Sequence, residues 1–521
     1  MAEIGKNIIE NLTTAMYENS YTVYREYIQN SADSIDKAID SGIITSSEAT
    51  IDIEIEYTKR KITINDNAMG IPKDEFYKKL SDIADSQKDK TKEKGFRGIG
   101  RLAGLAYCNA LIFRTSFKGE NVESVMKWDG VKLREVLSDV NQHPSASSLV
   151  DSIIECEVIP CDENSHFFEV IMEGVIPESD NLLDEHEVKE YLQMVAPVPY
   201  LNSFIFRSKI EEFIKKENLK IDQYNVLING NPIFKPYKTI LYEGTEDKKI
   251  QYDEINDIEF RKFETKDGEL LGWLWFGVTK FEKQIPIINP TRGIRIRKEN
   301  IQIGNEDTLS YPKFYKESRG NCYFVGELFA VSPNLIPNAR RDYFNTNPTL
   351  KKFEELITPT LYKEFYDLYH YASKVRSSFK KAAGYEKKQQ EFQEKVDNAG
   401  FLDSEDMLEA KKELENEKTN LEKAQREIEL RQKDAEKSSV LNRVFKQIET
   451  TYRPPEKKDD KTEKSPKKEE KDTKKYLTQN LSKYGKKEQK LISKIYGIVK
   501  AILPKDMAEM VITKIQEELS K

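Results

Sequence analysis

Three polar side chains close to the N-terminus, Glu26, Asn30 and Asp33, follow one another at offsets of four and three residues. In an α-helix these offsets put side chains on one face. Hydrolysis of ATP needs a carboxylate that orients water and a neutral oxygen that binds Mg²⁺ without repelling phosphate. The spacing therefore predicts a helix with a hydrolytic face, although a polar stripe is also typical of a solvated helix.

A turn at Asp66 offers a recognition group. Residues 61–65 alternate as a strand does, and Asp66 follows them at the start of a turn that contains Met69 and Gly70. The carboxylate could accept a hydrogen bond from the amino group of adenine. Aspartate and asparagine also begin ordinary turns, so this segment by itself supports either interpretation.

A glycine-rich run from Gly95 to Gly104 is suited to binding phosphate. Gly98 and Gly100 permit positive φ and close approach of the backbone, and the apolar pattern from Leu102 predicts a helix whose N-terminus faces the phosphates. No Gly-Lys-Ser/Thr follows and no strand leads directly into the run. It is therefore neither a Walker A loop nor a Rossmann turn.

The composition narrows the class of protein. A chain of 521 residues predicts about three domains. Charged residues make up 33%, yet the net charge is only −7, which argues against binding of nucleic acid by the whole surface. Four cysteines without CxxC spacing predict neither zinc nor a disulfide framework. The sequence shows no signal-like or membrane-length apolar stretch, so a cytoplasmic location without membrane contact is expected.

The N-terminal part alternates helical and strand patterns. Apolar residues recur at helical spacing over 17–40, and residues 51–57 and 61–65 alternate with period two. Residues 1–185 therefore predict an α/β sandwich with helices on one face of a mostly antiparallel sheet.

A second α/β domain is predicted over residues 190–345, with strands within 224–230, 271–277 and 293–297. Strand signals vanish after residue 347. Residues 347–450 therefore predict long charged helices, broken near Pro359 and around residues 398–400.

Half of a coiled-coil seam is present in this helical region. Met407, Leu414, Leu421 and Ile428 recur every seven residues, but the companion positions hold Lys411, Lys418 and Gln425. A coiled coil or helical hairpin and a solvated charged helix are equally compatible with this pattern.

The C-terminal part divides by composition. Residues 453–475 contain almost nothing apolar and predict a charged, disordered linker. Residues 476–521 regain amphipathic spacing and predict a small helical module for docking or oligomerisation.

Taken in this order and at these spacings, the three polar and glycine-rich segments resemble the GHKL ATPase superfamily, and above all its ninety-kilodalton heat-shock chaperone branch. The first motif of that branch, Glu-x-x-x-Asn-x-x-Asp-Ala-x-Asp, is matched by Glu26, Asn30, Asp33 and Asp36, with Ser34 in place of alanine. The resemblance implies an α+β protein: a GHKL (Bergerat) sandwich that binds ATP, a ribosomal-S5-like middle domain, and a helical or coiled-coil C-terminal region.

The same resemblance implies roles for individual residues. Glu26 would activate water, Asn30 would hold Mg²⁺ and Asp66 would read adenine. The other ATP-binding positions would be Asp33, Met69, Gly70, Ser86, Gly95, Arg97, Gly98, Ile99 and Gly100, of which those from residue 86 onward belong to a lid. Residues 331–344 resemble the middle-domain loop whose arginine reaches the γ-phosphate, a role open to Arg340 or Arg341.

Three positions depart from the pattern of the branch. Ala68 replaces a glycine, Asp85 stands where many of the chaperones have lysine, and the region around residues 166–174 lacks the threonine that usually supports the adenine-reading aspartate.

The resemblance implies a slow, Mg²⁺-dependent ATPase that closes as a homodimer and acts on a protein client or partner effector, as a chaperone or in bacterial defence. Two alternatives remain open: an ATP-gated DNA clamp similar to MORC and MutL proteins, for which DNA would be the partner, and a regulatory scaffold that binds nucleotide without hydrolysis.

Overall fold

The computed structural model describes residues 5–13, 19–82, 100–398, 400–401, 403–452 and 483–520. Contacts divide the chain into two compact units, Met1–Asp367 and Leu368–Lys521. Among the helices in the described ranges, none combines the length and the apolar content that crossing a bilayer needs. The predicted linker 453–475 lies outside the described residues.

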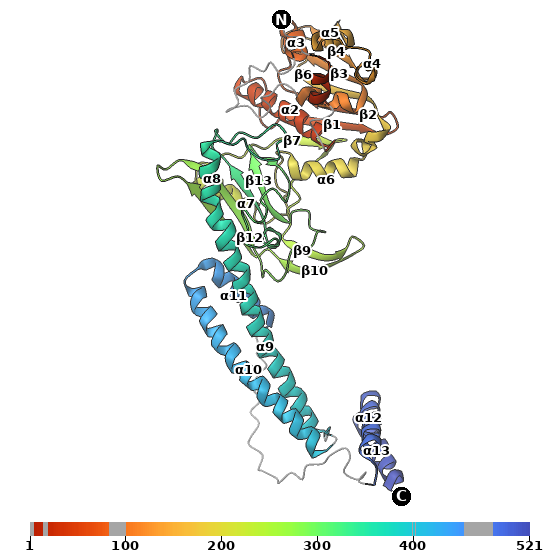
Figure 1. The fold of residues 1–521 in the computed structure, drawn as a ribbon, viewed down its shortest axis with the longest axis vertical. Coiled ribbons are helices and arrows are strands. Elements are labelled where there is room, and N and C mark those ends of the chain that lie inside the picture. The colour runs from red at the N-terminus through yellow and green to blue at the C-terminus, as the bar shows by residue number, and fades with distance from the viewer. Residues whose placement is uncertain are drawn as a thin grey trace. The chain divides into compact units, whose positions relative to one another are not determined.

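One eight-stranded sheet organises the N-terminal part of the first unit, with the order β5-β4-β3-β6-β2-β1-β7-β8 (Figure 1). Its strands are β1 (Thr50–Glu56), β2 (Lys61–Asp66), β3 (Cys108–Ser116), β4 (Val122–Asp129), β5 (Ile154–Pro160), β6 (Phe167–Val175), β7 (Asn225–Ile228) and β8 (Asn231–Pro232). Neighbouring strands are antiparallel except β1 and β7. In β1 the isoleucines are buried and the acidic residues between them are exposed, as alternation predicts for a sheet with one covered face.

Helices pack on this sheet. They are α1 (Asn7–Thr13), α2 (Thr22–Asp40), α3 (Lys73–Ser81), α4 (Gly130–Ser138), α5 (Ala146–Ile153) and the 3₁₀ segment η1 (Gly100–Ala106). The longest, α2, buries Tyr24, Tyr27, Ile28 and Ile35 in the same core as the isoleucines of β1 and β2. Burying a large apolar side chain contributes roughly 1.5–3 kcal/mol, so this face fixes α2 on the sheet. The predicted α/β sandwich is confirmed.

The strand at residues 225–228 was predicted for the second domain, and that assignment is wrong. β7 pairs in parallel with β1, with Ile51 opposite Val226, and the Ile55 amide donates to the Asn229 side chain at 2.8 Å. Alternation identified a strand but not its partner. Before β7 the chain passes through the 3₁₀ segment η2 (Pro177–Leu183), α6 (Glu185–Val195) and the helix Arg207–Lys216.

A five-stranded sheet follows in the same unit, in the order β11-β12-β15-β13-β14. Its strands are β11 (Asp257–Glu264), β12 (Leu270–Val278), β13 (Gly293–Lys298), β14 (Ile301–Ile303) and β15 (Val325–Ala330), and the hairpin β9 (Ile240–Thr245) and β10 (Lys248–Glu254) stands apart from it. Helix α7 (Arg207–Lys216) packs on it through Phe213, whose ring stacks on Phe260 at 4.1 Å between centroids. The strands predicted at 271–277 and 293–297 are confirmed.

The chain stays helical through Pro359, where a break was predicted. Helix α8 (Pro348–Thr358) passes into a π-helical turn (Pro359–Glu364) and then into α9 (Phe365–Asp397). Proline lacks an N–H donor and crowds the preceding turn, and a wider turn accommodates it without ending the helix. The break predicted near residues 398–400 is confirmed by the end of α9.

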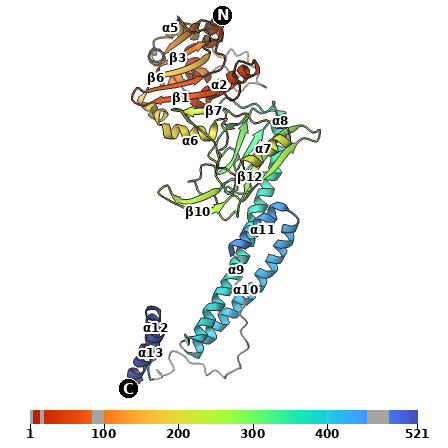
Figure 2. The ribbon, with the colours of Figure 1, turned by 180° about the vertical axis from the view of Figure 1, so that it is seen from behind.

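In the second unit, α9 and α10 (Ser404–Glu436) lie side by side and antiparallel in both views (Figure 1 and Figure 2). The Tyr371 hydroxyl donates to the Arg431 carbonyl at 2.7 Å, and Lys388 pairs with Glu417 at 2.8 Å. Helix α11 (Ser439–Tyr452) packs on the pair, and α12 (Lys486–Ile502) and α13 (Lys505–Ser520) form a separate two-helix module. The predicted helical C-terminal region is confirmed, whereas supercoiling of α9 and α10 stays a prediction.

Candidate active site

Glu26 and the end of the glycine-rich run lie against each other. Glu26 is 9% exposed, and a Cβ added to Gly100 would lie 2.3 Å from its Oε2 atom. Tyr27 holds the two elements together, because its hydroxyl donates to the Arg101 carbonyl and accepts from the Gly104 amide, both at 3.0 Å. The absence of a side chain at Gly100 is therefore what allows this position of the Glu26 carboxylate.

Asp66 lies at the end of β2 and is 1% exposed. Its Oδ1 accepts from the Ala68 amide at 3.2 Å, and the Ser31 hydroxyl on α2 also donates to this carboxylate. Within the described residues Oδ2 has no hydrogen-bond partner. Burial raises the pKa of Asp66 to about 7, and the hydrogen bonds from Ser31 and Ala68 oppose the rise. A buried, unpaired carboxylate oxygen is costly unless a ligand donates to it.

The turn after Asp66 is fixed by its fit against β3. Gly70 has φ +77°, and a Cβ there would lie 2.0 Å from the Ser116 carbonyl oxygen. The Thr115 hydroxyl accepts from the Ile71 amide at 3.0 Å and donates to the Phe167 carbonyl at 2.7 Å. Met69 is half-buried at the edge of the core. Only glycine meets both the conformation and the space at residue 70.

A loop from the second sheet region reaches α2. An antiparallel bridge between Pro337 and Phe344 closes this loop, and Arg341 within it has φ +55°. The Nε atom of Arg341 lies 3.7 Å from Glu26 Oε1, and Arg341 is 8% exposed. Arg340 is exposed, and its carbonyl accepts from Arg25 at 3.2 Å. Of the two arginines, Arg341 is therefore the one whose guanidinium lies at Glu26.

The charges around Glu26 are concentrated in a buried space. Arg25 lies 3.6 Å from Glu26 Oε1, so two guanidinium groups face one carboxylate. Burial lowers the pKa of Arg341, and the Glu26 carboxylate opposes this shift. A positive backbone φ at a non-glycine residue costs about 1–3 kcal/mol and tends to occur at functional sites. The arrangement holds positive charge next to the carboxylate at this strained position.

The remaining predicted residues fall into two groups. Asn30 is half-buried one turn after Glu26, and Asp33 is 5% exposed on the same helix. The others, Ser86, Gly95, Arg97, Gly98 and Ile99, lie outside the described residues.

Sequence reasoning missed Ser31, Arg25 and Tyr27. Ser31 on α2 supports Asp66, a role that was sought in the strand around residues 166–174. Arg25 adjoins Glu26 in sequence, which signals proximity but not an ion pair. The bridging role of Tyr27 had no sequence signal beyond its apolar periodicity, since its partners lie more than seventy residues away along the chain.

Comparison with known proteins agrees with this geometry. Residues 17–158 match the model of the family described as histidine kinase-, DNA gyrase B- and HSP90-like ATPase. Among curated proteins, the chain is 27% identical over 143 residues to the chaperone protein HtpG of Paraburkholderia xenovorans (24% of this chain, 22% of HtpG), and 25% identical over 171 residues to that of Coxiella burnetii (29% and 27%). It is 22% identical over 267 residues to HtpG of Francisella tularensis (48% and 37%).

The resemblance to GHKL ATPases is thereby confirmed for the N-terminal domain. The matched segment contains Glu26, Asn30, Asp66 and Gly100. The chain aligns with 22–37% of the length of these chaperones. What the whole chaperones do is therefore not transferred with the domain.

The residues present fit ATP and Mg²⁺. The unpaired Oδ2 of Asp66 is an acceptor suited to the amino group of adenine. The Arg341 guanidinium lies beside the Glu26 carboxylate, and the Asn30 carboxamide follows one turn later on the same helix. The Asn30 carboxamide offers a neutral oxygen of the kind that Mg²⁺ accepts beside phosphates, and it would hold the ion. These groups are of the kinds that binding of adenine and of phosphate requires.

Proposed function

We propose that the chain is an ATP-binding and ATP-hydrolysing conformational switch of the heat-shock-chaperone type. The observation that carries the proposal is Glu26, which lies between Gly100 of the glycine-rich run and Arg341 of the loop from the second sheet region. One carboxylate thus contacts the predicted phosphate-binding segment and a distant part of the chain at once.

Each residue has a defined task in this proposal. Asp66 accepts from the adenine amino group, which orients the nucleotide. Glu26 accepts a proton from, and orients, the attacking water. Asn30 would hold Mg²⁺, which when bound neutralises charge on the phosphates. Arg341 places positive charge where the transferred phosphoryl group becomes more negative.

The switch follows from the position of Arg341. Glu26 and a γ-phosphate both carry negative charge and compete for one guanidinium. ATP therefore favours a state in which the 337–344 loop moves towards the nucleotide, and hydrolysis favours the state described above. At saturating ATP, the equilibrium constant between the two states changes by the ratio of their affinities for ATP. Because such loop movements limit turnover in many enzymes, slow hydrolysis is expected.

The test is steady-state ATP hydrolysis by the full-length chain with Mg²⁺, together with calorimetric measurement of ATP binding. Glu26→Ala should abolish hydrolysis and leave binding within a few-fold of the unaltered chain. Asp40→Ala removes an exposed carboxylate from the same helix and should change neither quantity. Binding without hydrolysis in the unaltered chain would favour the regulatory scaffold, and absence of binding would refute the proposal.

The two-helix module supports a homodimer as the working form. Leu491, Ile495, Ile498 and Ile502 of α12 are 43–73% exposed and follow the alternating four- and three-residue spacing of a coiled-coil seam. The sequence of α12 has five lysines and one glutamate, whereas that of α13 has four acidic and two basic residues. A second copy that places its α13 beside this α12 covers the seam and pairs opposite charges.

Light scattering of the nucleotide-free chain tests the dimer. Ile495→Asp with Ile498→Asp should reduce the particle from twice the chain mass to a single chain, because two carboxylates cannot be buried in the seam. Asp40→Ala on α2 is the control, since it alters an exposed position outside the two-helix module, and it should leave the mass unchanged. A monomer before any substitution contradicts this part of the proposal.

The client stays a prediction from the resemblance: a protein client or partner effector, with a role as chaperone or in bacterial defence. Stimulation of hydrolysis by double-stranded DNA would instead favour the ATP-gated clamp. A cytoplasmic location also stays a prediction.

A further inference from the structure

The second unit carries a groove of about 460 Å³ along α9. Its lining includes Arg376, Lys380, Lys381, Gly384 and Lys388 of α9, and Glu417 of α10. Lys381, Gly384 and Lys388 are three and four residues apart, so they share one stripe of the helix, and Arg376 and Lys380, four residues apart, lie beside that stripe. We call this feature the α9 groove.

The stripe is more positive than its surroundings. Glu417 is the acidic residue of the lining, and it already pairs with Lys388 at 2.8 Å. Among the described residues, no carboxylate pairs with Lys380 or Lys381. The register set by Lys388–Glu417 and Tyr371–Arg431 puts Ala424 and Ile428 of α10 opposite this part of α9, and both are buried apolar residues. Ion pairing with α10 therefore does not explain why Lys380 and Lys381 occupy these positions on α9.

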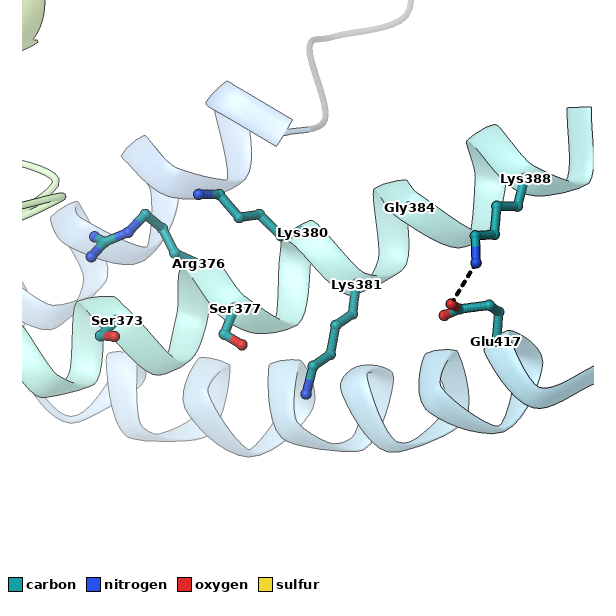
Figure 3. Close-up of a pocket in the computed structure, with 8 residues that line it drawn as sticks. All are labelled: Ser373, Arg376, Ser377, Lys380, Lys381, Gly384, Lys388 and Glu417. Atoms are coloured by element: carbon teal, nitrogen blue, oxygen red, sulfur yellow. Dashed lines mark hydrogen bonds and ion pairs between the residues drawn. The ribbon is translucent and has the colours of Figure 1, made fainter. Parts of the chain in front are cut away.

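The shape of the groove fits an extended anion. Figure 3 shows Arg376 and Lys380 extending from one side of α9 and Ser377 and Lys381 from the other, so that donors flank a strip of the helix. Within the strip Gly384 has no side chain, and a Cβ added there would meet nothing within 4 Å. Glycine is less favourable than alanine inside a helix, and here no packing constraint requires it.

Length and chemistry favour one ligand. From Ser377 to Lys388 the helix rises about 17 Å, a distance over which one strand of duplex DNA carries about five phosphates. Ser373 and Ser377 add hydroxyl donors of the kind that bind phosphate oxygens. The lining has no aromatic side chain on which an unstacked base could lie. We infer that the α9 groove binds the phosphate backbone of a double-stranded nucleic acid, without reading its sequence.

This inference is independent of ATP hydrolysis. The groove lies wholly within residues 373–417, in the second unit. Glu26→Ala should therefore bind a duplex as well as the unaltered chain does. If the unaltered chain binds the duplex but does not hydrolyse ATP, only the proposed switch is refuted. If it hydrolyses ATP but does not bind the duplex, only the groove is refuted.

The experiment measures binding of a fluorescent 30-base-pair DNA duplex to the full-length, nucleotide-free chain over a range of salt concentrations. Each phosphate contact adds about 0.9 to the slope of log affinity against log salt. Lys380→Ala with Lys381→Ala should lower that slope by about 1.8, which is about a 60-fold weaker affinity at 0.1 M salt if the affinities converge at 1 M. Gly384→Asp, which meets no steric obstacle, should weaken binding further by placing a carboxylate in the strip.

Lys411→Ala with Lys412→Ala is the matched control. Both lysines are exposed on α10 outside the groove, and their replacement changes the net charge by the same amount. The inference is overturned if the unaltered chain does not bind the duplex at low salt, or if both pairs of substitutions reduce the slope equally. It is also overturned if polyglutamate binds through Lys380 and Lys381 while the duplex does not, since the groove would then serve an acidic protein.

Discussion

Protonation of Asp66 should control adenine binding. The carboxylate is 1% exposed, one of its oxygens has no hydrogen-bond partner among the described residues, and burial raises its pKa to about 7. The ionised Oδ2 accepts a hydrogen bond from the amino group of adenine, whereas a protonated Oδ2 presents a donor to a donor. The test therefore varies pH between about 5 and 8 and compares ligand affinity in the unaltered chain with that in Asp66→Asn.

The size of the expected change in affinity follows from the fraction of Asp66 that is ionised. Below its pKa that fraction falls tenfold for each pH unit, so affinity should weaken about tenfold at pH 6 relative to pH 8 and approach 100-fold at pH 5. Adenosine is the appropriate ligand because it lacks the phosphates, which titrate in the same range. Calorimetric titration should show affinity rising with pH and levelling above pH 7, whereas Asp66→Asn should show a flat profile.

Stability of the nucleotide-free chain should change in the opposite direction. The folded-state pKa of Asp66 lies above the unfolded value of about 4, so between these values the folded chain binds a proton that the unfolded chain does not. Its contribution is therefore largest at low pH and is lost as pH rises through about 7, at a rate on the order of 1 kcal/mol per pH unit. Chemical denaturation of the unaltered chain and of Asp66→Asn at each pH measures this contribution to the free energy of unfolding.

A matched control separates Asp66 from general effects of charge. Asp40→Asn alters an exposed carboxylate on α2 and should retain the pH profile of the unaltered chain. Adenosine affinity that is independent of pH in the unaltered chain would refute the reasoning. An unchanged pH slope in Asp66→Asn would show that another group is responsible.

Three further substitutions test the packing of the site and of the second sheet. Gly100→Ala should reduce ATP turnover at least tenfold, because the added methyl group displaces Glu26. Gly384→Ala is the control: its methyl group meets nothing within 4 Å, so turnover should not change. Equal turnover in both variants would contradict this geometry. Tyr27→Phe removes two hydrogen bonds to the glycine-rich run and should lower the free energy of unfolding by about 1–3 kcal/mol in urea denaturation, with no change expected if these bonds are not formed. Glu327→Gln removes the charged partner of two buried cations and should lower the free energy of unfolding by about 3–5 kcal/mol in the same assay. A loss below about 1 kcal/mol would show that the cations are not charged when buried.

The core behind the second sheet shows why such a cost is expected. Lys235, Arg297 and Glu327 are all completely buried. Burial raises the pKa of Glu327, but the two cations outweigh it and hold the pKa at about 2, while burial lowers the pKa of Lys235 to about 7. Nothing in the sequence distinguished these residues from surface charges. Only the packing of distant strands brings them together.

Local features of the site could be predicted because they depend on neighbours in the chain. The offsets among Glu26, Asn30 and Asp33 required a shared helix face, and the alternation before Asp66 required a strand that ends at the turn. Similarity to a known family then placed these segments in one domain. The helical C-terminal region was predictable for the same local reason.

What the sequence determined by itself was the set of chemical groups and the elements that carry them: a carboxylate on a helix, an aspartate at a strand end and a glycine-rich run. Tertiary structure alone decided that β7 joins the first sheet, that Ser31 supports Asp66 and that Arg341 rather than Arg340 reaches Glu26. The physical reason is that periodicity reports which face of an element is buried, but not which other element buries it. That choice depends on the path of the whole chain and on the fit of side chains far apart in sequence.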